Sequence, residues 1–156
     1  MLALVPMTEA AYAAFLTRAI DDYADSNVEA GFWTRAEALE KSSADFRKLL
    51  PEGLATPRHY LRTIVRDADA QRVGEVWFAV KADSAKRAGF IYELFVEEKF
   101  RRLGYAHQAM QLVEAEARKL NLAELELHVF GYNHPARGLY EKLGYQVASL
   151  NLIKKL

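Results

Sequence analysis

Apolar residues divide the chain into an N-terminal helical third and a longer, sheet-forming part. Across residues 12–23 and 38–50 they recur every three or four positions, which is the period of an amphipathic α-helix. A threonine precedes each stretch at an N-cap position, and the second, Thr34, forms a capping-box sequence with Glu37. The pattern therefore predicts two helices, with a short strand over residues 2–5 before them.

Runs rich in β-branched and aromatic residues fill the middle of the chain. They cover residues 60–66, 73–80 and 89–96, and polar turns separate them, so they predict an antiparallel meander. A helix, a strand, a second helix and a last strand that completes the sheet are expected next, over residues 104–119, 122–130, 133–143 and 145–153. Because a strand–helix–strand unit usually forms a parallel pair, we expect an α/β (α+β) fold with a mixed, mostly antiparallel central sheet flanked by helices.

Length and composition indicate one globular domain over residues 1–156. A chain of 156 residues, 51% of them hydrophobic, is long enough to bury one core. Lysine plus arginine and aspartate plus glutamate number 21 each, so the formal net charge is zero. No overall attraction to nucleic acid or to an anionic membrane follows, and neither is expected as a partner.

Features that the sequence lacks exclude several kinds of reactive site and indicate a cellular location. The chain has no cysteine, which excludes disulfides, zinc–thiolate sites and a thiol nucleophile. Its four histidines do not follow metal-site spacing, so no metal is expected. The N-terminus lacks the basic and apolar regions of a secretion signal, and no apolar run approaches the ~18 residues of a membrane span, so we expect a cytoplasmic protein.

The most informative stretch, residues 90–107, changes from an apolar run into a charged turn and then into a helix. Gly104 and Ala106 are small residues, so a ligand can approach the backbone there. Three nearby residues add positive or potentially positive charge: Arg101, Arg102 and His107. Since the first N–H groups of a helix are unpaired and carry the positive end of its dipole, we predict a site for a phosphate or pyrophosphate.

A second motif follows this stretch, beginning 27 residues after Ala106. The two motifs read Arg101-x-x-Gly104-x-Ala106 and Asn133-x-x-Ala136-x-x-Leu139-Tyr140-Glu141-Lys142-Leu143-Gly144-Tyr145. In order, spacing and residue type they resemble the GCN5-related N-acetyltransferase (GNAT) family. The N-terminal third, through residues 30–33 and 49–53, is similar to a poorly characterised bacterial branch of that family.

The resemblance implies acetyl-CoA as the acetyl donor. Its pyrophosphate would bind seven successive residues: Arg101, Arg102, Leu103, Gly104, Tyr105, Ala106 and His107. In this family the sheet splays beside the preceding strand, so the pantetheine arm would pair with backbone groups of Leu94, Phe95 and Val96. Asn133 would cap the helix of the second motif and also contact the cofactor arm.

The resemblance also implies direct transfer of acetyl to a primary amine of a peptide, a protein or a small molecule. Tyr140 stands where the family has its general acid, and a tyrosine with a pKa of ~10 keeps its proton at neutral pH. The general base is open between Glu93 and His128. Other members carry a carboxylate acting through water on the strand of Glu93, and some carry a catalytic glutamate 12 residues before the tyrosine, where His128 lies. His128 is equally compatible with a place on the outer face of the sheet.

A module that binds or senses acetyl-CoA without turnover is the alternative to an enzyme, and the retained Tyr140 argues against it. The first two helices and the loop between them, which commonly border the acceptor cleft in this family, carry acidic residues that include Asp21, Asp22, Asp25, Glu29 and Glu37. This composition is compatible with a cationic acceptor. For the assembly, a homodimer is kept as a hypothesis.

Overall fold

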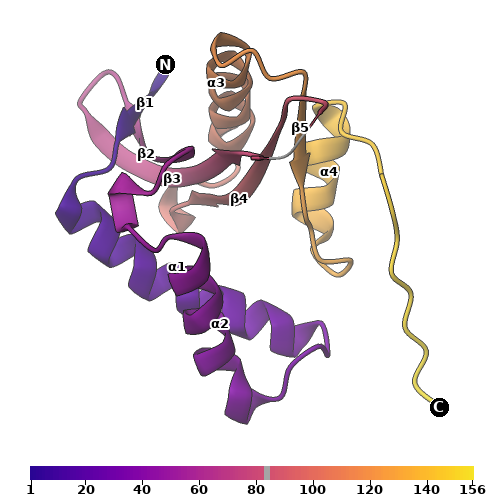
Figure 1. Ribbon diagram of the computed structural model, residues 1–156. Coiled ribbons are helices and arrows are strands. Elements are labelled where there is room, and N and C mark those ends of the chain that lie inside the picture. The colour runs from indigo at the N-terminus through magenta and orange to yellow at the C-terminus, as the bar shows by residue number, and fades with distance from the viewer. Residues whose placement is uncertain (83–84) are drawn as a thin grey trace.

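The computed structural model describes residues 1–82 and 85–156, and its elements form layers around one sheet (Figure 1). The sheet has five strands in the order β1-β2-β3-β4-β5. These are β1 (Leu2–Pro6), β2 (His59–Arg66), β3 (Gln71–Val80), β4 (Ala88–Val96) and β5 (Glu124–Leu127). Helices α1 (Glu9–Glu29) and α2 (Arg35–Leu49) cover one face, α3 (Tyr105–Lys119) covers the other, and α4 (His134–Lys142) lies beside β5.

The two N-terminal helices begin at the predicted caps. Ala11 N donates to Thr8 Oγ1 at 3.2 Å at the start of α1, and Thr34 N donates to Glu37 Oε1 at 3.1 Å at the start of α2. Both helices are therefore confirmed, although α1 extends further at each end than its apolar stripe. Short 3₁₀ turns follow at Gly53–Ala55 and Glu98–Phe100. Within the described ranges, no helix combines the length and the apolarity needed to cross a membrane.

The pairing of the strands confirms the mixed sheet. β1, β2, β3 and β4 pair antiparallel in succession, as the meander predicted. β4 and β5 pair in parallel through Ala88–Ile91 and Glu124–Leu127, as expected for strands joined by a crossing helix. β5 is much shorter than the predicted strand over residues 122–130, because its neighbour β4 does not continue alongside it.

One extra residue in β4 explains why the two strands separate. Trp77 of β3 pairs with Glu93, but the next residue, Phe78, pairs with Ile91, so Tyr92 is a β-bulge. β4 pairs with β5 only up to Ile91 and then continues to Val96 alongside β3 alone. The expected splay beside this strand is confirmed.

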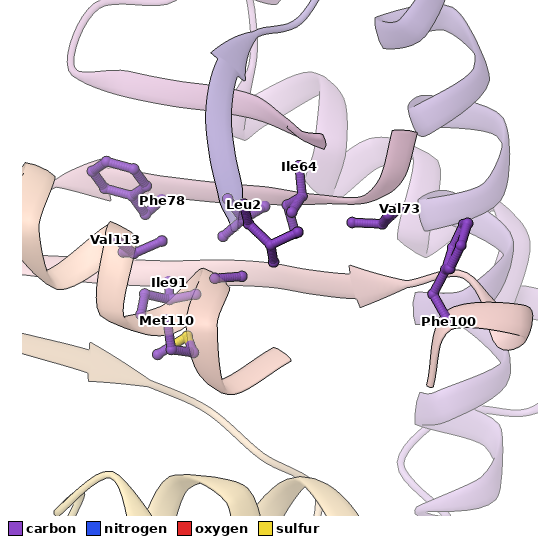
Figure 2. Close-up of a cluster of buried hydrophobic side chains, with 10 residues drawn as sticks. Leu2, Ile64, Val73, Phe78, Ile91, Phe100, Met110 and Val113 are labelled. Carbon is purple, nitrogen blue, oxygen red and sulfur yellow. The ribbon is translucent and has the colours of Figure 1, made fainter. Parts of the chain in front are cut away.

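Two hydrophobic clusters hold the layers together, one on each face of the sheet. Figure 2 shows the first, between the sheet and α3, in which Ile91, Met110 and Val113 lie close together. The second lies under α1 and α2, where Trp77 contacts the rings of Phe15 and Phe46 at centroid distances of 6.0 and 5.6 Å. The bulge places Tyr92 on this second face, stacked on Trp77 at 4.3 Å.

The predicted last strand is wrong. Residues 145–153 form no strand, and the chain after α4 runs away from the sheet to an extended C-terminus (Figure 1). Gly144, with a φ of 89°, begins this change of direction directly after the helix. The alternating apolar residues favour a strand, but a strand also needs a neighbour, and the chain does not bring this segment to the edge of its own sheet.

We predict that Trp77→Ala lowers the free energy of unfolding by about 3–5 kcal/mol. The Trp77 side chain is 2% exposed, and its removal leaves a cavity beside the rings of Phe15, Phe46 and Tyr92. Urea denaturation followed by circular dichroism measures the change. Leu39→Ala is the control, since Leu39 of α2 is 56% exposed and its replacement should change stability by less than about 0.5 kcal/mol. Equal losses in the two variants would contradict a core centred on Trp77.

Candidate active site

The turn between β4 and α3 uses left-handed backbone conformations at two positions. Arg102 has a φ of 61°, and Gly104, the N-cap of α3, has a φ of 76°. This region disfavours residues with a Cβ, and β-branched residues most strongly. A Cβ added to Gly104 would meet no protein atom within 4 Å, so the space in front of this glycine is open to a ligand.

The backbone N–H groups around Gly104 are not used by the protein itself. Among the residues that the structure describes, none of the N–H groups of residues 102–107 has an acceptor, and the first bond of α3 is from Gln108 N to Gly104 O at 3.1 Å. Residues 101–104 are exposed and residues 105–107 are half-buried. With the positive end of the α3 dipole, these groups can hold a phosphate.

β4 leads into this turn with one side of its backbone open. Glu97 N donates to Val73 O at 2.9 Å, which fixes the alternation of the β3–β4 ladder. Leu94 and Val96 therefore direct their N–H and C=O groups away from β3, on the side where β5 has already ended. A ligand with amide groups can pair there as an added strand would. Arg101 bends back over this edge, and its Nε donates to Val96 O at 3.0 Å.

Phe95 differs from its two neighbours in β4. Its backbone pairs with β3, where the strands approach so closely that a Cβ at Gly74 would lie 2.0 Å from Phe95 O. Its ring lies on the face covered by α1, with Arg18 Cζ 3.8 Å from the ring centroid. Of the three residues predicted to offer backbone groups to pantetheine, Leu94 and Val96 have the required orientation and Phe95 does not.

Arg18 of α1 connects two glutamates on the same face of the sheet. Its Nε lies 3.0 Å from Glu75 Oε1, and its Nη1 lies 3.1 Å from Glu93 Oε1 and 2.7 Å from Asp22 Oδ2. Glu75 is fully buried, and Arg72 Nη2 binds its second oxygen at 2.7 Å. Because a buried carboxylate is costly without charged partners, these two arginines are what allows Glu75 to lie inside.

Glu93 and Tyr140 come from distant parts of the chain and affect each other. Burial raises the pKa of the Glu93 carboxyl above its ordinary value, Arg18 opposes this shift, and the charges of Asp22 and Glu75 add to it. Burial also raises the pKa of Tyr140, and the negative charge of Glu93 raises it further. The charge of the carboxylate thus acts on the hydroxyl, and the shifts leave a carboxyl whose pKa is above the usual range and a hydroxyl that keeps its proton at neutral pH.

Helix α4 presents Tyr140 from the second motif. Asn133 Oδ1 accepts from Ala136 N at 3.2 Å, so the predicted N-cap is confirmed, while its contact with the cofactor arm stays a prediction. The half-buried Tyr140 ring lies edge-on to Tyr145, with centroids 5.7 Å apart. Burial raises the pKa of Tyr145 to about 12, and its hydroxyl has no partner in the described part of the chain.

Comparison with known proteins assigns this arrangement to a family. A sequence model of the acetyltransferase (GNAT) family matches residues 17–145. The chain is 35% and 34% identical to YycN and YdgE of Bacillus subtilis (strain 168), both named as uncharacterized N-acetyltransferases, over 98% of this chain and 97% of each relative. The crystal structure of YycN superimposes with a TM-score of 0.95 over 100% of this chain and 99% of that one.

The chain belongs to the GNAT acetyltransferase family. It is an N-acetyltransferase, and the resemblance seen in the sequence is confirmed. An aminoglycoside 6'-N-acetyltransferase, AAC(6')-Ih from Acinetobacter baumannii, has the same fold at 16% identity, with a TM-score of 0.59 over 100% of this chain and 98% of that one.

The structure places the predicted site residues on β4, on the turn into α3, at the start and in the middle of α4 and, for His128, directly after β5. Residues 101–107, the predicted pyrophosphate site, follow the open edge of β4, and the charge of Glu93 of β4 acts on Tyr140. His128 lies beyond the end of β5, is exposed, and contacts the Phe130 ring edge-on at 4.9 Å. Within the described ranges, no group of three or more histidine, aspartate or glutamate side chains could hold a metal ion.

Two residues of the site, Arg18 and Glu75, were not identified from the sequence. Glu75 gave a signal, since it is a single carboxylate within the apolar run of residues 73–80 and therefore needs a cationic partner if the strand is buried. The sequence has no such signal for Arg18, because a charged residue on the polar side of an amphipathic helix is common. Only the packing of α1 on the sheet brings it to Glu75 and Glu93.

Proposed function

We propose that this GNAT protein transfers acetyl directly from acetyl-CoA to a primary amine. The observation that carries the proposal is the open edge of β4, which ends in unpaired N–H groups at the start of α3 and has Glu93 and Tyr140 beside it. Acetyl-CoA matches this order of groups, since it has two amides in its pantetheine arm and a pyrophosphate beyond them. Membership of the GNAT family supports the same donor.

Each part of the donor has a counterpart in the chain. Backbone groups of Leu94 and Val96 pair with the pantetheine amides, and the N–H groups of residues 102–107 bind the pyrophosphate. A backbone N–H of the same strand, near Val96, polarises the thioester carbonyl and stabilises the oxyanion that forms on it. Asn133 lies at the start of α4 and contacts the arm from there.

The reaction forms one carbon–nitrogen bond and breaks one carbon–sulfur bond. The amine nitrogen attacks the thioester carbonyl carbon, and Glu93 accepts the proton that the nitrogen loses, directly or through a water. When the intermediate collapses, CoA leaves as a thiolate and Tyr140 donates the proton that makes it a thiol. The products are an N-acetyl amine and CoA, and no oxidant or metal is required for this balance.

A base is necessary because the acceptor is protonated in water. An alkylamine with a pKa of ~10.4 requires about 4.6 kcal/mol for deprotonation at pH 7. Glu93 suits this role better than His128, since burial raises the pKa of its carboxyl and the same site holds Tyr140. The exposed His128 contacts the Phe130 ring, and we assign it to the acceptor entrance.

The acceptor enters on the face covered by α1 and α2. The ring centroid of Phe32, in the α1–α2 loop, lies 6.3 Å from that of Phe130, and the centroids of Phe130 and Tyr132 lie 5.8 Å apart. Aromatic rings therefore border the proposed entrance. Four of the eight acidic residues of the two helices are already paired: Asp22 with Arg18, Asp25 with Arg35, Glu37 with Lys41, and Glu40 with Arg47. These contacts favour an amine attached to an apolar or aromatic group over a polycation such as a polyamine.

An acceptor screen tests this choice. Release of free thiol from acetyl-CoA is measured with peptide N-termini, lysine peptides, polyamines and an aminoglycoside, and arylalkyl amines are added as the favoured class. We expect turnover to be highest for amines with an aromatic substituent. Tight acetyl-CoA binding without thiol release on any class would favour the binding or sensing module instead.

Gly104→Val should weaken acetyl-CoA binding by roughly 10- to 100-fold, which is the loss of one charge-assisted hydrogen bond or slightly more. A valine disfavours the φ of 76° and places a branched side chain where the pyrophosphate meets the N–H groups. Isothermal calorimetry with acetyl-CoA measures the change.

Gly31→Val is the matched control for that experiment. Gly31 has a φ of 79° and open space around an added Cβ. A valine there has the same backbone strain, but at the α1–α2 turn and away from residues 101–107. The Gly31→Val variant should bind acetyl-CoA with the affinity of the wild type. If folded Gly104→Val also binds normally, the pyrophosphate site is elsewhere.

Tyr140→Phe should lower kcat by about 10²- to 10⁴-fold while the affinity for acetyl-CoA changes little, because the ring stays and only the proton is lost. Tyr145→Phe provides the control, since the Tyr145 hydroxyl is buried and its loss removes no hydrogen bond in the described part of the chain. Full turnover by Tyr140→Phe on a good acceptor would show that Tyr140 only packs against the donor.

The dependence of kcat/KM on pH distinguishes the two candidate bases. A carboxylate base is active when deprotonated, so activity should rise with pH through the pKa of Glu93, which lies above the ordinary ~4.3 of a glutamate. Glu93→Gln should abolish this rise and lower activity by about 10²-fold or more, whereas His128→Ala should keep it. Because Arg18 lowers the pKa of Glu93, Arg18→Met should move the rise to higher pH. A rise lost in His128→Ala and retained in Glu93→Gln would assign the base to His128.

A further inference from the structure

A cavity lies on the same face of the sheet as α1 and α2, and its lining comes from the strands and their connections. Its volume is about 750 Å³, which is the size of a small-molecule site. One row of paired residues forms its floor. His59 of β2 pairs with Ala79 of β3, which also pairs with Phe90 of β4, and Phe90 in turn pairs with Glu126 of β5. Because paired residues project from the same face, all four lie under the cavity.

The cavity lies next to the proposed general base. On the same face, the neighbouring row contains Trp77 and Glu93, which pair with each other. Trp77 and Ala79 of β3 are two residues apart, so the two rows are separated by roughly 7 Å. Tyr92, the bulge residue, stacks on Trp77 and also lines the cavity. A small molecule whose amine lies at Glu93 can therefore extend past Tyr92 and over Phe90.

Three aromatic rings form the part of the cavity nearest to Glu93. The ring centroids of Phe90 and Tyr92 lie 4.7 Å apart, and that of His59 lies 5.8 Å from Tyr92. All three side chains are half-buried, so each packs against its neighbours and still has an accessible surface. Rings packed side by side in this way offer a surface on which an aromatic group of a ligand can pack.

Two hydrogen-bond donors of these rings are free. Trp77 Nε1 donates to His59 Nδ1 at 2.9 Å. Burial lowers the pKa of His59 and the charge of Arg58 lowers it further, so the ring is neutral at neutral pH and its proton is on Nε2. In residues 1–82 and 85–156, neither this Nε2–H group nor the Tyr92 hydroxyl has a hydrogen-bond partner, and both remain accessible. The cavity thus offers two donors to a ligand.

Two cationic side chains border the cavity at the end away from Glu93. Lys81 follows β3, and its Nζ lies 2.9 Å from Glu126 Oε2, so this carboxylate is already paired. Arg58 precedes β2 with a φ of 64°, which is uncommon for a residue with a Cβ, and its carbonyl oxygen accepts from Val80 N at 2.9 Å. Its guanidinium has no partner within the described ranges. Because a guanidinium matches the geometry of a carboxylate, this end of the cavity favours an acidic group.

We propose that the acceptor is an arylalkyl amine with a carboxylate at the far end of its ring, and that this cavity binds the ring and the carboxylate. The inference rests on the proposed acetyl transfer and names the class of acceptor. The amine lies at Glu93, and the ring packs on Phe90 and Tyr92. The carboxylate accepts hydrogen bonds from His59 Nε2 and from the Arg58 guanidinium. Since a site with free donors rejects an analogue that lacks the acceptor group, the carboxylate determines specificity.

Two amines that differ only in the carboxylate test the proposal. Thiol release from acetyl-CoA is measured with 4-(2-aminoethyl)benzoate and with 2-phenylethylamine. KM should be about 10- to 100-fold lower for the benzoate, as expected for hydrogen bonds to a charged group, while kcat is similar. Arg58→Met should raise KM for the benzoate and so remove most of this preference. Arg47→Met, which changes an exposed arginine of α2 that does not line the cavity, should keep the preference of the wild type.

Binding without transfer separates this inference from the proposed function. 4-Ethylbenzoate has the ring and the carboxylate but no amine, and an NMR titration should show that Arg58→Met binds it at least about 10-fold more weakly than the wild type. Thiol release with the same KM for both amines would leave acetyl transfer standing and overturn the carboxylate site. Binding of 4-ethylbenzoate that depends on Arg58, without thiol release on either amine, would retain the carboxylate site and contradict transfer to this class of acceptor.

Discussion

The buried carboxylate of Glu75 is the constraint on which the packing of α1 against the sheet depends. Removing a carboxylate from water costs several kcal/mol unless charges inside replace the lost solvation. Arg18 and Arg72 supply these charges at 3.0 and 2.7 Å. Since Arg18 belongs to α1, satisfying Glu75 also fixes α1 against the sheet, and the same guanidinium then reaches Glu93. The position and the pKa of the proposed base thus depend on an ion pair deep in the sheet.

The bulge at Tyr92 has the corresponding role for the donor. It ends the parallel pairing with β5 and turns Tyr92 onto the aromatic cluster around Trp77. The backbone of Leu94 and Val96 remains without a strand neighbour on one side, in the described part of the chain, and leads directly to the open N–H groups before α3. Unpaired backbone groups lower the stability of a fold, and here they are collected along one line that a thioester donor can occupy.

The two faces of the sheet therefore have different tasks. The cluster in Figure 2 anchors α3 and, through α3, the N-terminus at which the donor's phosphates are proposed to bind. The opposite face, with Arg18, Glu93 and the aromatic rings of Phe32 and Phe130, is where we propose that the acceptor binds. In the proposed reaction the thioester lies between them, where β4 and β5 separate, and Tyr140 of α4 is its proton donor.

Local patterns in the sequence determined the elements, their caps and the family. Thr34, Glu37, Asn133 and Gly104 act through neighbours within a few residues, so their roles follow from spacing alone. The tertiary structure decided what depends on contacts between distant segments: the bulge that shortens β5, the ion pairs of Arg18, and the course of the C-terminal segment 145–156. The C-terminal segment 145–156 shows the reason most clearly. Its alternation indicates a strand, but whether a strand forms depends on which edge lies within reach, and no residue within the segment carries that information.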